Sequence, residues 1–447
     1  MRNDVVVIGG GIAGLATAAL LSKRGLRTVV LEKGNQAGGR AYAYEDKGFT
    51  FNYGAHAMYR PQSGLLAQVM ARLGRDVPAW SAPDAMRSFW SDGDRWGSLG
   101  AKPHQAITSK LFPLATKARL GGLMLALRTA KPDNVPADMP WRDWVEQHTS
   151  DPLLRRFAIA LTVVNTYTSD PGALSARGVL RHLSENLFAK DYVGYMHGGW
   201  GVMLDAFADE IASNGGAIVT GARVSSLEER DGRITAAIVD GQRYEADAFV
   251  STLPPQDAPA LAAAGTPLAR ELAQWQGMQD VRAIAIDLGF GRRLRTDLTF
   301  IFDIERDLYF SIHSEVAQGL APDGSQLLHT LAYLTPEDAA SDAAVERRYH
   351  ELLAGLDRFF EGWRDAVVVE RTMKNVRVTA ARRTPEQYAP NGVPLRSAAA
   401  ANLYFANDAR DLPYFLSLGC LAAAMEVADA IGAALPAAGA RPEAVPA

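Results

Sequence analysis

The hydrophobic positions near the start of the chain predict two short strands joined by a helix. Residues 5–8 are apolar and mostly β-branched, which is typical of a buried strand and too short for a buried helix. A helix is expected over 15–23, ended by Gly25, and a second strand over 28–31. A strand, a helix and a second strand in this order favour an α/β fold with a parallel sheet.

The turn after the first strand has the spacing of a dinucleotide-binding loop. Gly9, Gly11 and Gly14 match the pattern G-x-G-x-x-G. We assign Gly9 to the tight turn, Gly11 to the close approach of a pyrophosphate, and Gly14 to the packing of the helix on the strand. The positive end of the helix, which includes Ile12 and Ala13, is then expected to bind the phosphates.

The second strand leads to an acid and then to a flexible loop. Glu32 is placed to accept hydrogen bonds from an adenosine ribose and to repel a 2′-phosphate, which disfavours NADP. The loop begins with Lys33 and ends with Gly38, Gly39 and Arg40. The two glycines allow a close approach of the backbone, and the arginine supplies charged donors. Because such a loop suits a longer dinucleotide, we predict that these five residues bind FAD rather than NAD.

With this acid and this glycine-arginine loop, the sequence resembles the FAD-dependent amine oxidase and phytoene desaturase superfamily. The stretch 165–175 looks closer to the phytoene desaturase-like branch than to the monoamine oxidases. The resemblance implies a Rossmann-type FAD-binding domain, a separate substrate domain, and oxidoreductase activity with FAD as the cofactor.

The segment 48–56 is similar to the family's segment beneath the flavin ring. The resemblance places Gly54, Ala55 and His56 at the cofactor. The family commonly has an aspartate where this chain has Asn52, so one charge near the flavin is missing here.

Two later stretches carry further FAD-binding residues by resemblance. A strand is expected over 217–224, and the residue that matches Val224 holds the adenine through its backbone in related flavoproteins. Residues 402–409 resemble the family's strand that ends in Ala-Gly-Asp. This match places Asp408 on the ribityl chain, next to Asn407, which replaces the usual glycine.

A helix rich in small residues is predicted over 416–425, with Ser417 as its cap. Directed at the N1–C2=O edge of the flavin, its first residues, including Ser417 and Leu418, would stabilise the negative charge of the reduced ring. The alternative is an ordinary packed helix that closes the domain, and both interpretations are compatible.

The candidates for catalysis are few. His56 is the first, because it alone among the histidines lies in a stretch expected at the flavin; the alternative is a histidine that holds its loop through a backbone hydrogen bond. His197 is a weaker candidate. Tyr414 and Phe415 are either an aromatic wall of the substrate site or simple packing. Cys420 is interpreted as a buried free thiol rather than a flavin attachment site.

Composition agrees with a large enzyme of two domains. The 447 residues carry 46 basic and 50 acidic side chains, a formal charge of −4, and no basic block, so nucleic acid is not an expected partner. The single cysteine excludes a disulfide framework and a cysteine-based metal cluster, and no metal site is predicted. The first strand begins at residue 4, so we expect no signal peptide and a cytoplasmic location.

The FAD signals are separated in sequence, so the cofactor domain is predicted to consist of three segments. Short apolar strands between 281 and 378 predict a curved sheet in a mixed α+β substrate domain, and residues 100–190 are expected to be helical. The predicted FAD-binding domain is 1–70, 195–265 and 395–433, the substrate domain is 71–194 and 266–394, and 434–447 is a disordered tail.

The sequence therefore predicts an FAD-dependent oxidoreductase of the desaturase or dehydrogenase type, which takes a hydride from a largely apolar small molecule. A flavin amine oxidase and a lipid-carrying protein on a flavin fold are the alternatives. No second G-x-G-x-x-G is present, so a nicotinamide nucleotide is not an expected reductant. Residues 105–131 mix apolar and basic side chains, which suits either a peripheral membrane contact or a helix pair buried in the substrate domain.

Overall fold

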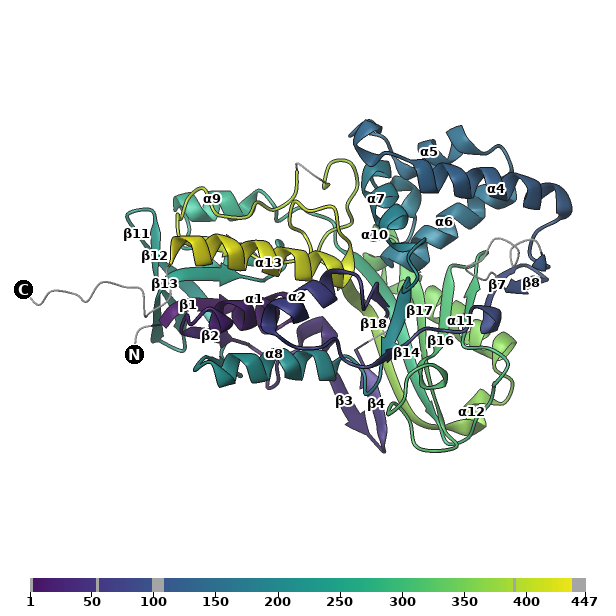
Figure 1. Cartoon of the computed structure of the whole chain (residues 1–447), viewed down its shortest axis with the longest axis horizontal. Coiled ribbons are helices and arrows are strands. Elements are labelled where there is room, and N and C mark those ends of the chain that lie inside the picture. Colours follow the sequence, from purple (N-terminus) through teal and green to yellow (C-terminus); the bar gives the residue numbers. More distant parts are fainter. Residues whose placement is uncertain (1–2, 54–55, 99–107, 389–390, 436–447) are drawn as a thin grey trace, which may run out of the picture.

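The computed structural model describes residues 3–53, 56–98, 108–388 and 391–435. Two seven-stranded sheets dominate it, one at each end of an elongated molecule (Figure 1). The described ends of the chain lie together at the end that holds the first sheet (Figure 1).

The first sheet collects strands from distant parts of the sequence. Its parallel strands include the three that precede the glycine turn, Glu32 and Asn407. The strands at the far edge pair antiparallel. The order is β10 (Ala217–Val219), β2 (Thr28–Leu31), β1 (Asn3–Ile8), β13 (Gln242–Ser251), β12 (Arg233–Val239) and β11 (Val224–Arg230), with β19 (Leu403–Phe405) beside β13.

Both faces of this sheet are buried, as a parallel sheet requires. Alternate residues of β1 point to opposite sides: Val5 and Val7 join the core beneath the helices, and Val6 and Ile8 join the core on the other face. The helices on the first side are α1 (Ile12–Lys23), α2 (Leu65–Leu73), α8 (Gly201–Ser213) and α13 (Leu416–Ala434), and α9 (Pro267–Ala273) packs on the second.

The second sheet is largely antiparallel and separates two further cores. One face packs on α11 (Asp342–Phe359), and the other packs on a group of helices drawn at the top right of Figure 1. The strand order is β18 (Val367–Thr379), β14 (Val281–Phe290), β17 (Gln326–Leu334), β16 (Leu308–Ile312), β15 (Phe300–Asp303), β7 (Ser88–Asp92) and β8 (Arg95–Ser98). The helices of the group are α4 (Leu114–Thr129), α5 (Trp141–His148), α6 (Pro152–Thr166) and α7 (Ala176–Asn186).

Short strands form two smaller sheets, one two-stranded and one three-stranded. Their members are β3 (Ala43–Asp46), β4 (Phe49–Asn52), β5 (Met58–Tyr59), β6 (Trp80–Ser81) and β9 (Val193–Met196), and the remaining short helices are α10 (Pro336–Ala339) and α12 (Trp363–Ala366).

Two local predictions were wrong. The strand expected over 217–224 is two strands, because Gly221 adopts a φ of +67° and its N–H donates to the carbonyl of Gly34 at 2.8 Å, which turns the chain. Ser417 does not cap the last helix. Phe415 occupies the N-cap position without a side-chain hydrogen bond, and Ser417 lies inside the first turn.

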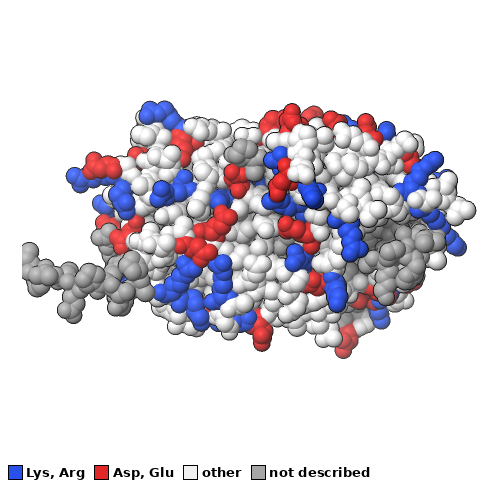
Figure 2. Space-filling model, turned by 45° about the horizontal axis from the view of Figure 1, so that its top comes forward, with Lys and Arg blue, Asp and Glu red and all other residues white. Residues whose placement is uncertain are grey.

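The last helix, α13, is the one described helix that is long and apolar enough to cross a membrane, and 61% of that apolar stretch is buried within the protein. Such burial is typical of a core helix. Over the face shown in Figure 2, basic and acidic side chains are interspersed rather than gathered by sign.

Candidate functional site

The carboxyl ends of four parallel strands meet at one edge of the first sheet. Gly9 follows β1, Glu32 follows β2, Thr252 follows β13, and Asn407 follows β19 after one residue. Ligands of open α/β sheets bind outside this edge. The topology thus gathers residues from four distant stretches of sequence around one position.

The start of α1 is shaped for an anion. No side chain caps the helix, and its first turn carries no acidic residue. Gly14 packs against the turn so closely that an added Cβ would lie 2.0 Å from the carbonyl oxygen of Gly9. At Gly11 an added Cβ would meet nothing nearer than the Gly38 carbonyl oxygen at 3.9 Å. The fold therefore requires a glycine at 14, whereas the space above Gly11 is available to a ligand.

The carboxylate of Glu32 is held at the end of β2 by backbone donors. The N–H of Gly10 donates to Oε2, and the N–H of Gly34 donates to Oε1, each at 2.7 Å. The residue is 9% exposed. Since each carboxylate oxygen has two acceptor sites, Glu32 can accept further hydrogen bonds from a ribose.

An ion pair between the partly exposed Arg40 and the buried Asp408 lies across the site from the glycine turn. Two guanidinium nitrogens of Arg40 donate to the two carboxylate oxygens of Asp408, both at 2.8 Å, and the N–H of Ala380 also donates to Asp408 at 3.0 Å. Burial by itself raises the pKa of Asp408, but the charge of Arg40 and its hydrogen bonds lower that pKa below the usual value. Asp408 is therefore ionised, and Arg40 is fixed beside the cavity.

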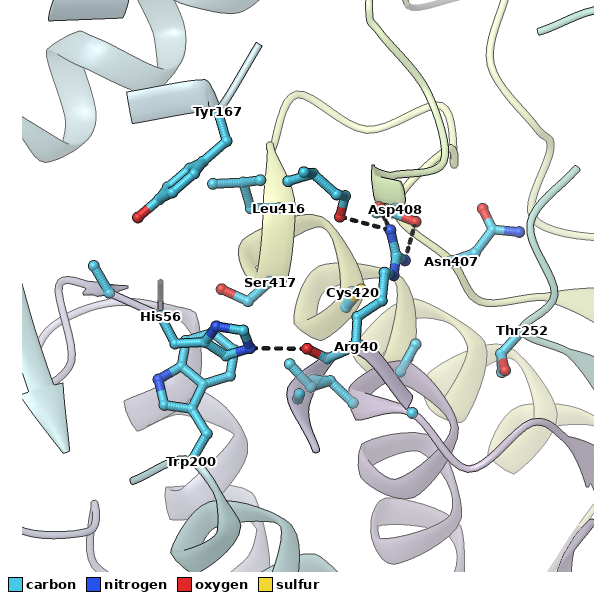
Figure 3. A pocket seen from close by; sticks show the side chains of 16 residues that line it. Arg40, His56, Tyr167, Trp200, Thr252, Asn407, Asp408, Leu416, Ser417 and Cys420 are labelled. Atoms are coloured by element: carbon cyan, nitrogen blue, oxygen red, sulfur yellow. Dashed lines mark hydrogen bonds and ion pairs between the residues drawn. The ribbon is translucent and has the colours of Figure 1, made fainter. Parts of the chain in front are cut away.

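These elements surround a cavity with about 780 Å³ of empty space, open solvent included. Figure 3 shows Tyr167, His56 and Trp200 at one end of it, and Thr252 and Asn407 at the other. The lining residues are Gly11, Ile12, Ala13, Arg40, Ala41, His56, Ala57, Tyr167, Trp200, Thr252, Val378, Asn407, Asp408, Leu416, Ser417 and Cys420.

The ring of His56 is positioned by backbone and by an aromatic neighbour. Nε2 lies 2.8 Å from the carbonyl oxygen of Arg40 (Figure 3), and because a carbonyl only accepts, Nε2 carries the proton. The ring packs edge-on against Trp200, with 4.4 Å between ring centroids. This geometry is that of a residue that orients its loop and forms a wall of the cavity.

The cavity contains about half of the residues predicted from sequence to bind the cofactor. Lys33 is exposed, Leu418 is buried in the core of α13, and Val224 begins β11 outside the cavity. Gly54 and Ala55 lie outside the described residues. The predicted residues that line the cavity are Gly11, Ile12, Ala13, Arg40, His56, Asn407, Asp408 and Ser417, whereas Gly9, Gly14, Glu32, Lys33, Gly38, Gly39, Val224 and Leu418 do not line it.

The N-terminus of a second helix also reaches the cavity. Leu416, Ser417 and Cys420 of α13 line it, together with the start of α1. Burial raises the pKa of Cys420 to about 12, so its thiol is protonated and unreactive. The hydroxyl of Ser417 points into the space between His56 and Leu416 (Figure 3).

Sequence reasoning missed Tyr167, Thr252 and Val378. Tyr167 ends α6 in the left-handed conformation, with a φ of +56°, and Leu416 begins α13 with a φ of +54°. Such backbone costs free energy and is found preferentially at functional sites. Only Thr252 had a sequence signal, because it follows a strand that belongs to the same parallel edge.

The other aromatic candidates lie outside the cavity. Phe415 is buried between the cores, with its ring 5.3 Å from that of His182, and Tyr414 does not line the cavity. His197 accepts or donates one hydrogen bond with Ser81 at 2.8 Å and is likewise not a lining residue. Among the described residues, no group of three or more His, Cys, Asp or Glu could hold a metal ion.

A family model described as flavin containing amine oxidoreductase matches residues 12–432. The chain belongs to this family. The match confirms the predicted superfamily and a flavin as its cofactor.

Two kinds of relatives are similar to parts of the chain. The phytoene desaturase (lycopene-forming) of Pantoea ananas is 27% identical over 280 residues, which cover 56% of this chain and 55% of that protein. The all-trans-retinol 13,14-reductase of Macaca fascicularis is 43% identical over 67 residues, 15% of this chain and 11% of that protein. The matches thus span about half of the first relative and a small part of the second.

Solved structures share the fold over nearly the whole chain. An oxidoreductase from Methanosarcina mazei superimposes with a TM-score of 0.79 at 21% identity, covering 95% of this chain and 100% of that one. Putrescine oxidase bound to putrescine superimposes with a TM-score of 0.73 at 17% identity, covering 97% and 99%. These likenesses confirm the predicted fold class, an α/β FAD-binding fold with an added mixed domain.

The residues present fit FAD. The uncapped start of α1 and the space above Gly11 suit the pyrophosphate, and Glu32 suits a ribose. The remainder of the cavity, with Arg40 and Asp408 in the middle and aromatic side chains at one end, suits the ribityl chain and the ring.

Proposed function

We propose that the protein is an FAD-dependent oxidoreductase of the desaturase or dehydrogenase type that acts on a largely apolar small molecule. The observation that carries the proposal is the end of the cavity formed by Tyr167, His56 and Trp200 (Figure 3), which adjoins the core between the second sheet and α6. An apolar substrate placed there would meet aromatic and aliphatic side chains rather than charges.

When bound, FAD supplies the hydride acceptor of the reaction. The chain supplies orientation and charge. Arg40, fixed by Asp408, lines the cavity. The start of α13 also lines it, so the positive end of this helix would stabilise negative charge on a flavin held there. His56 and Trp200 form a wall of the cavity. Their rings pack on each other, Nε2 of His56 donates to the carbonyl oxygen of Arg40, and the backbone N–H of Trp200 donates to Oδ1 of Asn52.

The relatives support this substrate class. Phytoene and retinol, named in the two relatives, are apolar polyenes, and the longer match is to the phytoene desaturase. An amine oxidase is the second candidate, because putrescine oxidase shares the fold. An amine oxidase would need an aromatic cage beside the flavin, for which the sequence offers Trp200, Tyr404 and Tyr414. Of these three residues, only Trp200 lines the cavity. A purely lipid-carrying role would not require the ion pair of Arg40 and Asp408.

The test is anaerobic mixing of the FAD-loaded protein with phytoene, all-trans-retinol, putrescine and cyclohexylamine, each followed by the flavin absorbance. Bleaching by a polyene supports the proposal, and bleaching by the amines alone assigns the protein to the amine oxidases. NADPH should bleach slowly, because the sequence has no second dinucleotide motif. His56→Ala should slow the reaction by loosening the wall, and an unchanged rate would remove His56 from the mechanism.

We also propose that α4 makes a peripheral membrane contact through which such a substrate enters. Leu120, Leu123 and Leu127 of α4 pack into the core, while Leu114 and Leu125 are 81% and 61% exposed. Lys117 and Arg128, among other basic side chains, lie on the same helix. Co-sedimentation with anionic vesicles tests the contact. Binding should weaken in the double variant Leu114→Ser/Leu125→Ser, and absence of binding by the unaltered protein would refute the contact.

A further inference from the structure

A row of buried polar side chains crosses the second sheet on the face opposite α11. The register of the strands places Arg371, Asp287, His329 and Ser311 side by side on β18, β14, β17 and β16. Asp287 and His329 are 0% exposed, and Ser311 is 1% exposed. The same face is otherwise apolar or aromatic, so polar groups with this degree of burial require an explanation.

Asp287 orients His329. The imidazole Nδ1 lies 2.7 Å from Oδ1 of the carboxylate, and Arg371 donates from Nε to Oδ2 at 3.0 Å. Burial by itself raises the pKa of Asp287, but His329 and Arg371 lower it below the usual value, so the carboxylate is ionised. Since a carboxylate only accepts, Nδ1 of His329 carries the proton and Nε2 is left as an acceptor.

A second imidazole extends this pair. The ring of His313 lies 4.3 Å from that of His329 and 4.4 Å from that of Tyr195, measured between centroids. Both nitrogens of His313 and Nε2 of His329 are buried without a hydrogen-bond partner among the described residues. Buried nitrogens without a partner require an explanation, such as a catalytic role or a bound water.

Hydroxyl groups continue the series toward the cavity. The hydroxyl of Tyr195 lies 3.2 Å from that of Tyr309 and accepts from Ser311 at 3.3 Å. The ring of Tyr309 lies 6.0 Å from that of Tyr167, which lines the cavity. Burial lowers the pKa of His313 well below its usual value, so this imidazole is neutral.

We propose that His313 and His329, oriented by Asp287, form a buried proton relay that serves the substrate side of the FAD cavity. In a dehydrogenation the substrate loses a hydride to the flavin and a proton from the neighbouring atom. The bond to that proton breaks, its electron pair enters the new double bond, and the proton passes by way of the hydroxyl groups and a bridging water to Nε2 of His329. The carboxylate of Asp287 balances the positive charge that results.

This inference rests on the proposed function, and its test separates the two. The holoenzyme and the variants His313→Gln, His329→Gln and Thr330→Val are mixed anaerobically with phytoene, all-trans-retinol, putrescine and cyclohexylamine, in H₂O and in D₂O. Thr330 is the matched control, because it is equally buried beside His329 but directs its hydroxyl to the carbonyl of Ile286. His329→Gln keeps an N–H for Asp287 and removes the group that can exchange a proton.

We expect both histidine variants to retain FAD and to reduce it at least about tenfold more slowly, since general acid-base groups contribute factors of about 10² or more. We expect a solvent isotope effect in the unaltered protein, which should persist in Thr330→Val and disappear in the histidine variants. Substitution of a residue that only supports the fold would leave this isotope effect unchanged. Wild-type rates in both histidine variants would overturn the relay.

A second measurement does not require the substrate. The holoenzyme carrying ¹⁵N-labelled histidine is compared before and after photoreduction of the flavin, and the two histidine variants assign the signals. The negative charge of the reduced flavin should draw a proton onto the imidazoles, so the signals of His313 and His329 should change. If no probe bleaches the flavin, the proposed function fails for these substrates, while unchanged histidine signals overturn the relay itself.

Discussion

Gly11 offers a test that separates folding from cofactor binding. Its backbone is extended, with φ −78° and ψ −174°, a conformation that alanine adopts readily. The nearest atom to an added Cβ would be the Gly38 carbonyl oxygen at 3.9 Å, an ordinary van der Waals contact. Nothing in the described fold therefore requires glycine at this position, and the only group that a methyl would obstruct is a ligand in the cavity.

The substitution Gly11→Ala should stabilise the apoprotein and weaken its binding of FAD. A compatible replacement of glycine by alanine stabilises a protein by about 0.4–1 kcal/mol, because the unfolded chain loses freedom. Displacing the pyrophosphate by the thickness of a methyl group removes one or two hydrogen bonds to a charged group, each worth about 1.5–3 kcal/mol. The dissociation constant of FAD should then rise by about tenfold to a hundredfold for each bond lost.

The assay is denaturant unfolding of the apoprotein together with titration of the apoprotein with FAD, followed by flavin fluorescence. Gly121→Ala on α4 is the matched control, because an added Cβ there meets nothing within 4 Å and lies far from the sheet edge in sequence. Gly14→Ala should show the opposite pattern, because its Cβ would lie 2.0 Å from the Gly9 carbonyl oxygen.

Two results would refute this reasoning. Unaltered FAD affinity in Gly11→Ala would mean that the pyrophosphate does not approach the helix at this point. Loss of folding in the Gly11→Ala apoprotein, with Gly121→Ala folded, would mean that the glycine serves the fold rather than the ligand.

Three further predictions concern charges that the structure places in or near the core. Glu32→Ala should weaken FAD binding by about tenfold to a hundredfold in the same titration, because ribose hydrogen bonds to a carboxylate are lost; equal affinity would exclude Glu32 from the site. Asp408→Asn should lower the free energy of unfolding by about 2 kcal/mol, less than for a fully buried pair because 37% of the Arg40 side chain is exposed; urea unfolding measures the change, and no loss would show the pair to be energetically neutral. Burial lowers the pKa of His182 to about 4, below the value of about 6.5 in the unfolded chain. The unfolded state therefore binds the proton first, so stability is complete above pH 6.5 and falls by up to about 3 kcal/mol as the pH falls to 4. His182→Phe should make this decline shallower, and an identical pH profile would contradict the assignment.

The sequence by itself determined the cofactor half of the protein, because its signals are local. The strand at 5–8, the glycine turn and Glu32 lie within a single βαβ unit, and each residue type is required by the backbone or by the ligand at that point. Arg40 and Asp408 were recognised as separate motifs by resemblance, although only the structure shows that they form an ion pair across 368 positions of sequence.

The tertiary structure alone decided the substrate side. Tyr167 reaches the cavity because α6 ends there in a left-handed residue, and no local pattern announces that direction. Asp287, His329 and Arg371 come from three strands, separated by 42 and 84 residues, and read individually as ordinary polar positions in apolar runs. Their alignment depends on the register of an antiparallel sheet, in which a shift of one residue would turn every side chain to the opposite face. The packing of the whole domain sets that register, so the order of the residues along the chain does not reveal it.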